Sequence, residues 1–574
     1  MNLNQSVRLS ELPKVNIQRS KFDRSHKHTT TFNVGRLIPI YLGEVLPGQT
    51  TKIDTSVVLR LQTLIRPIMD NLYLDTYFFF VPNRIIWDHW KEFMGENSDS
   101  AWIPQVEHPM PTLKAPTGGF SSGSIADYFG IPINVGGLEV SALPFRAYAE
   151  IVNQDYRDQN LQTPIVVTKD DTSYTGLKSS DSAYDDQISC LQLGGAPFIA
   201  GKYHDRFTSC LPYPQKHEDV MIPLDGYLPV LPMAGEWDVR LLQWKDPTGQ
   251  NNGRIWPTIL GTFTGISSED LSPISSANKL GVNASGEMSR VADTSFSNTY
   301  HPTFWNLGAD LSQGVNASIN DLRMSLALQR LYERDAMYGS RYTEMLVGQF
   351  GVRSADYRLQ RPEFLGGDHI PLNIDQVINL ASPSVSDQDP LGHVGAYSLT
   401  GKIHSDVMQS FTEHGWIIGL AVCRYEHSYQ QGLHKMWKRF DRTDHYFPVF
   451  AEISNQPVYR SEIYATGHSS NDDSVFGYQE AWYDYRYGDY NHVTGEMRSG
   501  ISNTLDSWHL ADYYESAPYL SAEWIREDET NVDRCLEVSS SVSNQIFADF
   551  YFKEETVLPM PIYSIPSIND SFIK

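Results

Sequence analysis

Cysteine and long apolar runs are both scarce in this chain of 574 residues. Its four cysteines are widely and irregularly spaced, which argues against a disulfide framework, and none forms the Cys-x-x-Cys pair typical of zinc sites. The longest strongly apolar runs, residues 77–81 and 416–423, are far shorter than the ~20 residues that a membrane-spanning helix needs. They predict buried strands instead. No apolar signal-peptide segment is present near the N-terminus, so we expect cytoplasmic synthesis and no membrane insertion.

Charged residues make up only 20% of the chain and are mostly acidic, which gives a net charge of −24. That sign argues against nucleic-acid binding by the surface as a whole. The exception is the N-terminal segment, where seven Lys and Arg residues among the first 40 are opposed only by Glu11 and Asp23. Because Lys and Arg can neutralise phosphates, the segment predicts an extended basic arm that contacts DNA, although an arm that clamps a neighbouring subunit is an equal alternative. The candidate DNA-contacting residues are Arg8, Lys14, Arg19, Lys21, Arg24 and Lys27.

Sequence motifs for phosphate or metal chemistry are missing or incomplete. No GxSxG, HExxH or dinucleotide-binding glycine pattern occurs. The stretch GGAPFIAGKY, residues 194–203, resembles a phosphate loop, but Ala196 and Tyr203 stand where glycine and Ser/Thr are required. Cys423 and His427 are four residues apart, and we interpret them as a core cysteine and a surface histidine rather than as metal ligands.

Paired carboxylates offer one further possibility. Asp484 and Asp489 lie in a Tyr-rich loop and could act as an acid–base pair beside sugar-stacking rings. Sequence spacing does not fix the distance between two carboxylates, so packing of this loop at a subunit boundary is the preferred interpretation. We therefore expect no catalytic residue, no metal site and no cofactor, and we do not expect an enzyme.

Apolar patterns predict β-strands toward both ends of the chain. In the N-terminal part they fall within residues 35–45, 50–64 and 71–81, separated by turn signals. In the C-terminal part they fall within residues 416–425, 445–449, 461–466 and 545–552. Strands at both ends fit a jelly roll, in which N- and C-terminal strands share one sandwich. Helices are predicted at residues 83–94 and 144–157, the second with proline near its start.

The clearest helix signal lies in residues 316–367. Ser318 is a favourable N-cap, and Gly339 is placed to end the helix. A second short helix is predicted at residues 341–350, followed by an Arg-rich turn that ends at Gly366 and Gly367. The first helix has two apolar faces, so its own chain or a neighbouring copy must cover both sides. One face carries Ile319, Leu322 and Leu326, and the roughly opposite face carries Met324, Leu328 and Leu331.

Residues 225–305 are dominated by turn signals that alternate with short apolar pieces. Those pieces include Trp237, Trp244 and Trp256. Their number predicts a small β subdomain rather than a large independent core.

Four ordered blocks carry a resemblance to a known family. The longest reads LQRLYERDAMYGSRYTEML and then FGVRSADYRLQRPEFLGG. The others are residues 17–48, residues 69–96, and FTSCLPYPQK at 207–216, in which Tyr213 replaces an expected Trp. Together these blocks resemble the major capsid protein of the gokushoviruses, small icosahedral single-stranded DNA phages of the microvirus family. Blocks spread over much of the chain are more specific than one short motif.

The resemblance implies a mainly β fold, a single eight-stranded antiparallel jelly roll with long insertions that contain helices and a small surface subdomain. The implied divisions are a basic arm at 1–30, strands and a first long insertion at 31–224, a variable surface protrusion at 225–305, and a helical insertion with the remaining strands at 306–574. It also implies a T=1 shell of sixty copies around a circular single-stranded DNA genome. Such a protein is made in the bacterial host cytoplasm and resides in the virion.

The partners implied by the resemblance are other copies of the chain, single-stranded DNA on the inner surface, a small basic internal DNA-binding protein, a DNA pilot protein and a host cell-surface receptor. The protrusion, with Trp237, Trp244 and Trp256, is the candidate for host attachment. A polysaccharide-binding or glycoside-cleaving β-sandwich is the alternative from another functional class. The candidate assembly contacts are Leu322, Leu326, Leu328, Arg330, Leu331, Tyr332, Arg334, Gly366 and Gly367.

Overall fold

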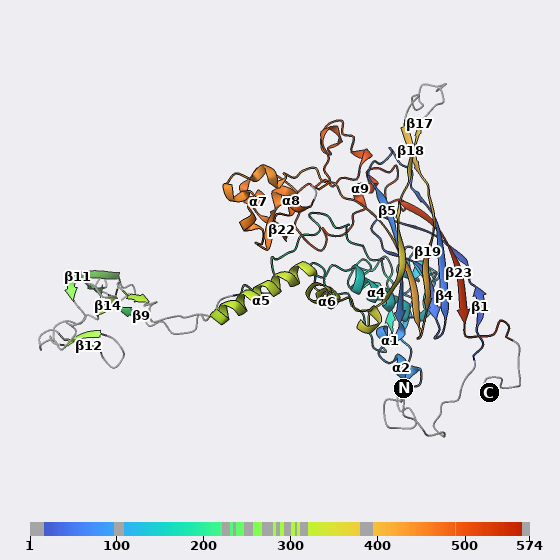
Figure 1. Cartoon of the computed structure of the whole chain (residues 1–574), viewed down its shortest axis with the longest axis horizontal. Helices are drawn as coiled ribbons and strands as arrows, with labels where there is room; N and C mark the ends of the chain where they lie inside the picture. The colour runs from blue at the N-terminus through green and yellow to red at the C-terminus, as the bar shows by residue number, and fades with distance from the viewer. Residues whose placement is uncertain are drawn as a thin grey trace, which may run out of the picture. The chain divides into compact units, whose positions relative to one another are not determined.

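The computed structural model describes residues 17–96, 108–220, 319–378, 394–487 and 490–564 in full, and within residues 221–318 it describes only the backbone of strands. The chain forms two compact units (Figure 1). The first unit comprises Met1–His217 and Tyr332–Lys574, and the second comprises Glu218–Leu331. None of the helices within these described residues is long and apolar enough to cross a membrane.

A sandwich of two antiparallel sheets forms the first unit. One sheet has the order β1-β23-β4-β19, with β2 also paired to β23, and the other has the order β16-β5-β20-β3. The early strand β2 and the late strand β23 are neighbours along their whole shared length, from His26 opposite Phe552 to Phe32 opposite Ile546. This is the jelly-roll arrangement that the sequence predicts. The strands are β1 (Ser20–Asp23), β2 (His26–Phe32), β3 (Ile38–Val45), β4 (Thr50–Leu61), β5 (Leu72–Pro82), β16 (Glu363–Pro371), β19 (Thr400–Ser410), β20 (Gly415–Tyr425) and β23 (Ile546–Leu558).

The predicted basic arm and the structure differ at their boundary. The prediction ended the arm at residue 30, but strand pairing begins at Ser20, where β1 aligns with the far end of β23. β2 contains many polar Thr and His residues because one of its faces stays exposed to solvent. This polar composition made the strand hard to recognise in the sequence. β1 and β2 follow each other along the same edge of β23, so nine strand segments build the two sheets.

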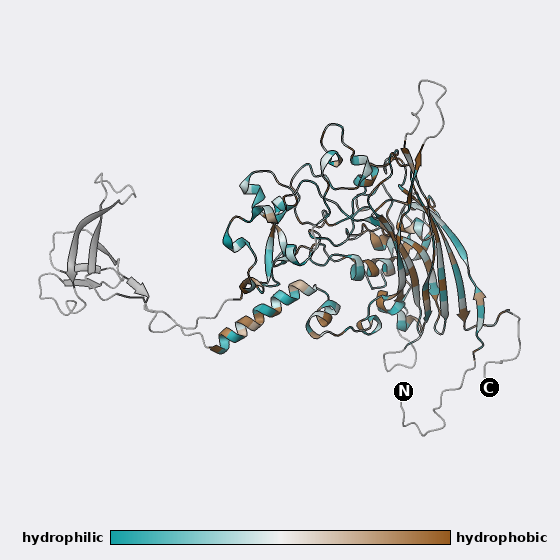
Figure 2. Cartoon of the chain, turned by 45° about the horizontal axis from the view of Figure 1, so that its top comes forward, coloured by the Kyte–Doolittle hydropathy of each residue, from teal (hydrophilic) through white to brown (hydrophobic). Residues whose placement is uncertain are grey.

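Strands β5 and β20 are buried on both faces, which explains their continuous apolar sequences. Phe78 and Phe80 point into the core between the two sheets, whereas Phe79 and Val81 point into a second core on the other side. Alternate side chains of β20 divide in the same way: Ile417 belongs to the first core, and its neighbours on both sides face outward from it. In Figure 2 the strands of the sandwich show hydrophobic and hydrophilic residues alternating where only one face is covered.

The second core lies under the long insertion between β5 and residue 217. Its centre is α4, in which every residue is buried, and Pro144 lies at the start of the helix as predicted. The single helix predicted at 83–94 is instead two short helices, because Trp87 takes an extended conformation and is fully buried. The elements are α1 (Asn83–Ile86), α2 (Trp90–Phe93), β6 (Thr112–Lys114), α3 (Ile125–Tyr128), β7 (Glu139–Ser141), α4 (Leu143–Ile151) with a π-helical turn at Val152–Tyr156, β8 (Tyr174–Thr175) and a 3-10 turn at Leu191–Leu193.

Two strands predicted in the C-terminal part are wrong. Residues 445–449 lie between and within short 3-10 turns, and Pro448 there cannot donate a backbone hydrogen bond to a sheet. Residues 461–466 include a 3-10 turn, and the buried Ile463 packs in a small third core without strand pairing. The elements present are β17 (Ile374–Ile378), β18 (Val394–Ser398), β21 (Asn455–Tyr459), α7 (Ser469–Asp472), β22 (Val475–Glu480), α8 (Tyr483–Arg486) and α9 (Thr530–Asp533), with 3-10 turns at Asp356–Leu359, Lys435–Lys438, Arg442–Asp444, Pro448–Phe450, Arg460–Glu462, Gly495–Met497 and Asp506–Trp508.

The second unit contains short antiparallel strands. Strand β10 is central to a three-stranded sheet and pairs with both β11 and β14. The strands are β9 (Val230–Pro232), β10 (Trp237–Lys245), β11 (Trp256–Ile266), β12 (Lys279–Val282), β13 (Met288–Val291), β14 (Tyr300–Phe304) and β15 (Leu307–Ala309).

Two helices follow those strands in sequence. Helix α5 (Ile319–Tyr338) ends where predicted, one residue before Gly339, whose φ of +109° favours glycine. The predicted N-cap Ser318 lies outside the described residues. Helix α6 (Tyr342–Phe350) begins after Arg341.

Candidate assembly surfaces

Helix α5 exposes apolar side chains along most of its length. Ala336 is its only buried residue. Leu326 is 55% exposed on one predicted face and Met324 is 70% exposed on the other. Figure 2 shows hydrophobic and hydrophilic residues alternating around this helix. Within the described residues, therefore, both apolar faces of α5 keep exposed side chains.

The other residues predicted for assembly on this helix are partly or fully accessible. Leu322 and Leu331 are exposed, while Leu328 and Tyr332 are half-buried. The guanidinium-bearing side chains of Arg330 and Arg334 are exposed.

Helix α6 and its flanking turns add further exposed apolar groups on a well-anchored base. Arg341 donates to the carbonyl of Arg157 at 2.7 Å, and Arg361 pairs with Asp155 at 2.7 Å. Lys216 donates to the carbonyl of Gly339 at 2.8 Å. These bonds hold the segment in place although few of its side chains are buried. The exposed apolar residues are Tyr342, Val347, Phe350, Val352 and Tyr357.

The turn predicted at Gly366 and Gly367 is wrong, because both residues lie within β16. A Cβ at Gly366 would collide with the carbonyl oxygen of Asp406, and one at Gly367 would collide with that of Thr76. Close approach of neighbouring backbones therefore requires glycine at both positions. This close packing explains why both residues are glycine, and their role as assembly contacts stays a prediction.

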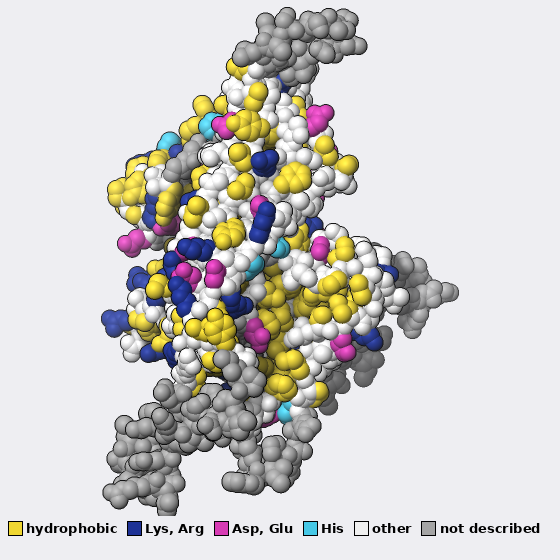
Figure 3. All heavy atoms as spheres, turned by 90° about the vertical axis from the view of Figure 1, so that its right-hand side faces the viewer, with side chains coloured by type: hydrophobic (Ala, Val, Ile, Leu, Met, Phe, Trp, Pro, Cys, Tyr) yellow, Lys and Arg dark blue, Asp and Glu magenta, His cyan; other side chains and the backbone are white. Residues whose placement is uncertain are grey.

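Three of the six basic residues predicted to contact DNA already have acidic partners on β23. Lys21 pairs with Glu555 at 2.8 Å and Lys27 pairs with Asp549 at 2.7 Å. Arg24 lies 3.4 Å from Glu554, whose carboxylate is buried. Figure 3, which views the side bearing this sheet, shows basic and acidic side chains next to one another. Arg19 is exposed, whereas Arg8 and Lys14 lie outside the described residues.

The candidate attachment residues lie on paired strands of the second unit. Trp237 aligns with Ile266, and Trp244 aligns with Pro257 in the next strand. Trp256 aligns with Lys245 at the other end of the pairing. Their backbones therefore belong to one hairpin, β10 with β11, while their side chains are outside the description.

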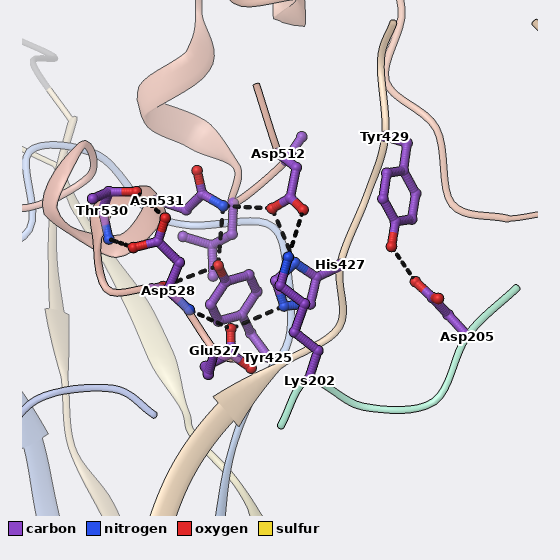
Figure 4. Close-up of polar contacts among 12 residues, drawn as sticks. Lys202, Asp205, Tyr425, His427, Tyr429, Asp512, Glu527, Asp528, Thr530 and Asn531 are labelled. Carbon is purple, nitrogen blue, oxygen red and sulfur yellow. Dashed lines mark hydrogen bonds and ion pairs between the residues drawn. The ribbon is translucent and has the colours of Figure 1, made fainter. Parts of the chain in front are cut away.

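The sequence did not reveal a buried charge cluster between β20 and the C-terminal segment (Figure 4). His427, predicted to be a surface histidine, is only 4% exposed. Its Nδ1 lies 2.9 Å from Asp512 and its Nε2 lies 2.9 Å from Glu527. Lys202 pairs with Asp512 at 3.2 Å. The surface position predicted for His427 is wrong, because two carboxylates from distant parts of the sequence surround it in the fold.

The electrostatics of this cluster favour a protonated histidine. Burial lowers the pKa of His427, but the carboxylates of Asp512 and Glu527 outweigh burial and raise the pKa to about 9. Burial also opposes ionisation of Asp512, but Lys202 and His427 hold its pKa well below the usual range. Two positive and two negative side chains then balance in the interior, which is the arrangement that buried ions require.

The cluster removes the candidate phosphate site, whereas only Asp484 of the candidate acid–base pair lies within the described residues. Lys202 of the phosphate-loop-like stretch is buried and paired, so its ammonium is not offered to a ligand. Asp484 pairs with Arg439 in a nearly buried contact, and Asp489 lies outside the described residues. Cys423 is fully buried as predicted.

One group within the described residues has the donors and spacing to hold a metal ion, contrary to the expectation of no metal site. Ligand atoms of His89, Glu92 and His108 all lie within 4.8 Å of one another. The His89-x-x-Glu92 spacing was a weak local signal. His108 comes from a separate segment, so no short motif unites the three.

Comparison with known proteins identifies the whole chain. A family described as Capsid protein (F protein) matches residues 10–568. Capsid protein VP1 of Spiroplasma virus 4 is 42% identical over 557 residues, covering 96% of both chains. Capsid protein VP1 of Bdellovibrio phage phiMH2K is 37% identical and covers 97% of both chains. Capsid protein VP1 of Chlamydia phage 1 is 37% identical over 98% of this chain and 97% of the relative. The chain therefore belongs to the capsid protein (F protein) family and is a structural capsid protein rather than an enzyme.

Proposed function

We propose that this chain is the building unit of a T=1 shell of sixty copies that encloses a circular single-stranded DNA genome. The observation that supports this proposal most directly is α5, a 20-residue helix with a single buried residue. An amphipathic helix normally buries one apolar stripe against its own domain. A helix with two exposed apolar faces is instead suited to lie between neighbours.

The energy available from this helix fits repeated, individually weak contacts. A fully buried Leu or Met side chain contributes about 1.5–3 kcal/mol relative to an exposed one. Leu322 is 41% exposed and Met324 is 70% exposed, so roughly half of that contribution remains to be gained from a neighbour. Each subunit would make such contacts in several directions, heterologous around five-fold and three-fold axes and isologous at two-folds. The stability of a closed shell would then be the sum of many small burial free energies.

Two substitutions that differ mainly in polarity test the role of α5. Leu326→Gln should reduce the yield of closed particles because it places an amide where apolar cover is needed, while Leu326→Met should assemble like the parent. The yield is measured by sedimentation, and subunit folding is checked by circular dichroism. Charge reversal at Arg330 and Arg334 should likewise impair assembly more than folding. Normal particles from Leu326→Gln and from the charge-reversed variant would contradict the interface.

We propose that the N-terminal segment contributes to holding DNA inside the shell, with Arg8, Lys14 and Arg19 as its main contacts. Lys21, Arg24 and Lys27 support this role less, because their charges are opposed by carboxylates. A deletion that ends before Ser20 leaves β1 in place and should lower the packaged DNA per particle. Lys27→Gln is the matched control and should package normally. Equal packaging by the deletion variant would remove the DNA role.

The remaining DNA charge would be balanced by other virion components. A basic segment with few free cations per copy cannot neutralise a whole genome, so we propose a small basic internal DNA-binding protein and a DNA pilot protein as partners. Particles purified from infected cells should contain both proteins, and their absence by mass spectrometry would count against this division of roles.

We propose host attachment for the strands of the second unit, with Trp237, Trp244 and Trp256 as candidate contacts. Compact surface units on a rigid scaffold commonly carry recognition. Replacing residues 225–305 with a short linker should leave particle yield unchanged and reduce adsorption to host cells. A triple Trp→Ala variant separates the tryptophans from the segment as a whole. Collapse of the particles would show that the segment is structural.

A further inference from the structure

We propose that His89, Glu92 and His108 form a binding site for a divalent transition-metal ion, best matched by Zn²⁺. Their ligand atoms lie within 4.8 Å of one another, so small side-chain shifts bring all three onto one ion. The site lies in the insertion that covers β5 and β20.

Short helices place the first two ligands. His89 directly precedes α2, and Glu92 lies within it, so both come from one turn of backbone. The fully buried side chain of Trp87 anchors this segment in the second core. His108 comes from the residues that precede β6, and its Nε2 lies 3.0 Å from Glu92.

Asp171 orients both imidazoles from behind. It lies 2.9 Å from Nδ1 of His89 and 2.6 Å from Nδ1 of His108. An ionised carboxylate can only accept hydrogen bonds, so each Nδ1 is the donor to Asp171 and Nε2 is the nitrogen left to bind a metal. For His108, metal binding displaces the Nε2 proton that faces Glu92 at 3.0 Å. Trp87 donates to the same carboxylate at 2.7 Å. A carboxylate that receives the second nitrogen of a metal-binding histidine is the usual outer partner in zinc sites.

The loop that carries Asp171 is itself clamped. Arg146 is buried and donates to the carbonyl of Asp170 at 2.8 Å and to that of Thr172 at 3.1 Å. The outer carboxylate therefore cannot easily turn away, and the two histidine rings are held stacked with centroids 3.8 Å apart. The clamp fixes the outer carboxylate, whereas the stacked rings must turn relative to each other for both Nε2 atoms to reach one ion.

The donor set and its exposure favour zinc over calcium or magnesium. Two imidazoles and one carboxylate, with water as the fourth ligand, are a common zinc combination, whereas calcium and magnesium prefer oxygen ligands throughout. His89 and Glu92 side chains are each 36% exposed and His108 is 16% exposed, so an ion can enter and keep a water. Binding would replace the hydrogen bond between His108 and Glu92. The ion would then tie α2 to the segment before β6.

Metal stoichiometry of untagged protein tests the site. The parent protein, stripped with a chelator and then dialysed against micromolar Zn²⁺, should retain one tightly bound zinc per chain by mass spectrometry of the metal. A variant with His89→Gln and His108→Gln should lose it, and Glu92→Gln, which changes a partly exposed residue, should weaken it. The control His468→Gln changes an exposed histidine elsewhere and should bind as the parent does.

Asp171→Asn provides a second, independent readout because it removes no ligand. It should weaken zinc affinity about 10- to 100-fold while leaving the stoichiometry at saturation unchanged. Dialysis against Mg²⁺ should leave no bound ion in any variant. Equal zinc retention by the parent and the double histidine variant, or no tightly bound zinc in the parent, would overturn the proposal.

Discussion

The buried cluster around His427 should make subunit stability fall as the pH rises from about 6.5 toward 9. The pKa of His427 rises from an ordinary value of 6.5 to about 9 in the folded chain. Below the ordinary value both folded and unfolded chains bind the proton, so the full contribution is present. As the pH passes the folded value, the folded chain also loses the proton and the contribution disappears. At about 1.4 kcal/mol per pH unit, the difference corresponds to about 3 kcal/mol.

Urea unfolding of the purified subunit, followed by tryptophan fluorescence between about pH 6 and pH 9.5, measures this effect. Other titrating groups also change stability, so the informative quantity is the difference between the parent and His427→Gln. That difference should be largest near pH 6 and should shrink by about 3 kcal/mol at the alkaline end. His468→Gln serves as the control and should follow the parent throughout. A parent-to-variant difference that stays constant with pH would refute the idea that His427 is the charged centre of the cluster.

Three further outcomes are expected from other parts of the subunit. Gly367→Ala should destabilise the subunit by at least about 1–3 kcal/mol, because its Cβ meets the Thr76 carbonyl, whereas Gly401→Ala on a neighbouring strand has open space and should be nearly neutral in urea unfolding. Equal effects of the two would argue against the close backbone approach. Glu462→Gln should cost about 3–5 kcal/mol by leaving the buried Arg206 without its charge partner, and the double change Arg206→Met with Glu462→Leu should recover much of that loss. A double variant as unstable as the single one would contradict this balance. Lys21→Gln should change the free energy of unfolding by less than about 1 kcal/mol, because its pair with Glu555 is exposed, and a larger loss in the same assay would show that β1 depends on it.

The sequence predicted those elements whose local pattern and tertiary surroundings agree. β20 and β23 were found because apolar residues dominate the first and alternate with polar ones in the second. β19 was missed because its sequence, TGKIHSDVMQS, is largely polar and exposed on a sheet edge. Residues 445–449 were predicted as a strand from their aromatic and β-branched composition, but that composition is also compatible with the short turns that they form.

Sites assembled from distant segments could be predicted only in part. The apolar character of α5 was readable, since helical spacing is a local property. The burial of His427 could not be predicted from the sequence, because Asp512 and Glu527 come close to it only in the folded chain. Similarly, Gly366 and Gly367 read as a turn locally, and only the pairing of β16 shows that neighbouring backbones demand them.

The position of β23 between β2 and β4 has a consequence for how the protein is made. A ribosome produces β2 and β4 early, yet the strand that joins them emerges only after several hundred further residues. Until β23 is made, the edges of β2 and β4 that it later covers have unpaired backbone N–H and C=O groups. Such edges are prone to pair with other chains. A prematurely terminated polypeptide lacks β23 and cannot complete the sheet. Completion of this sheet therefore depends on a chain that has been translated through β23.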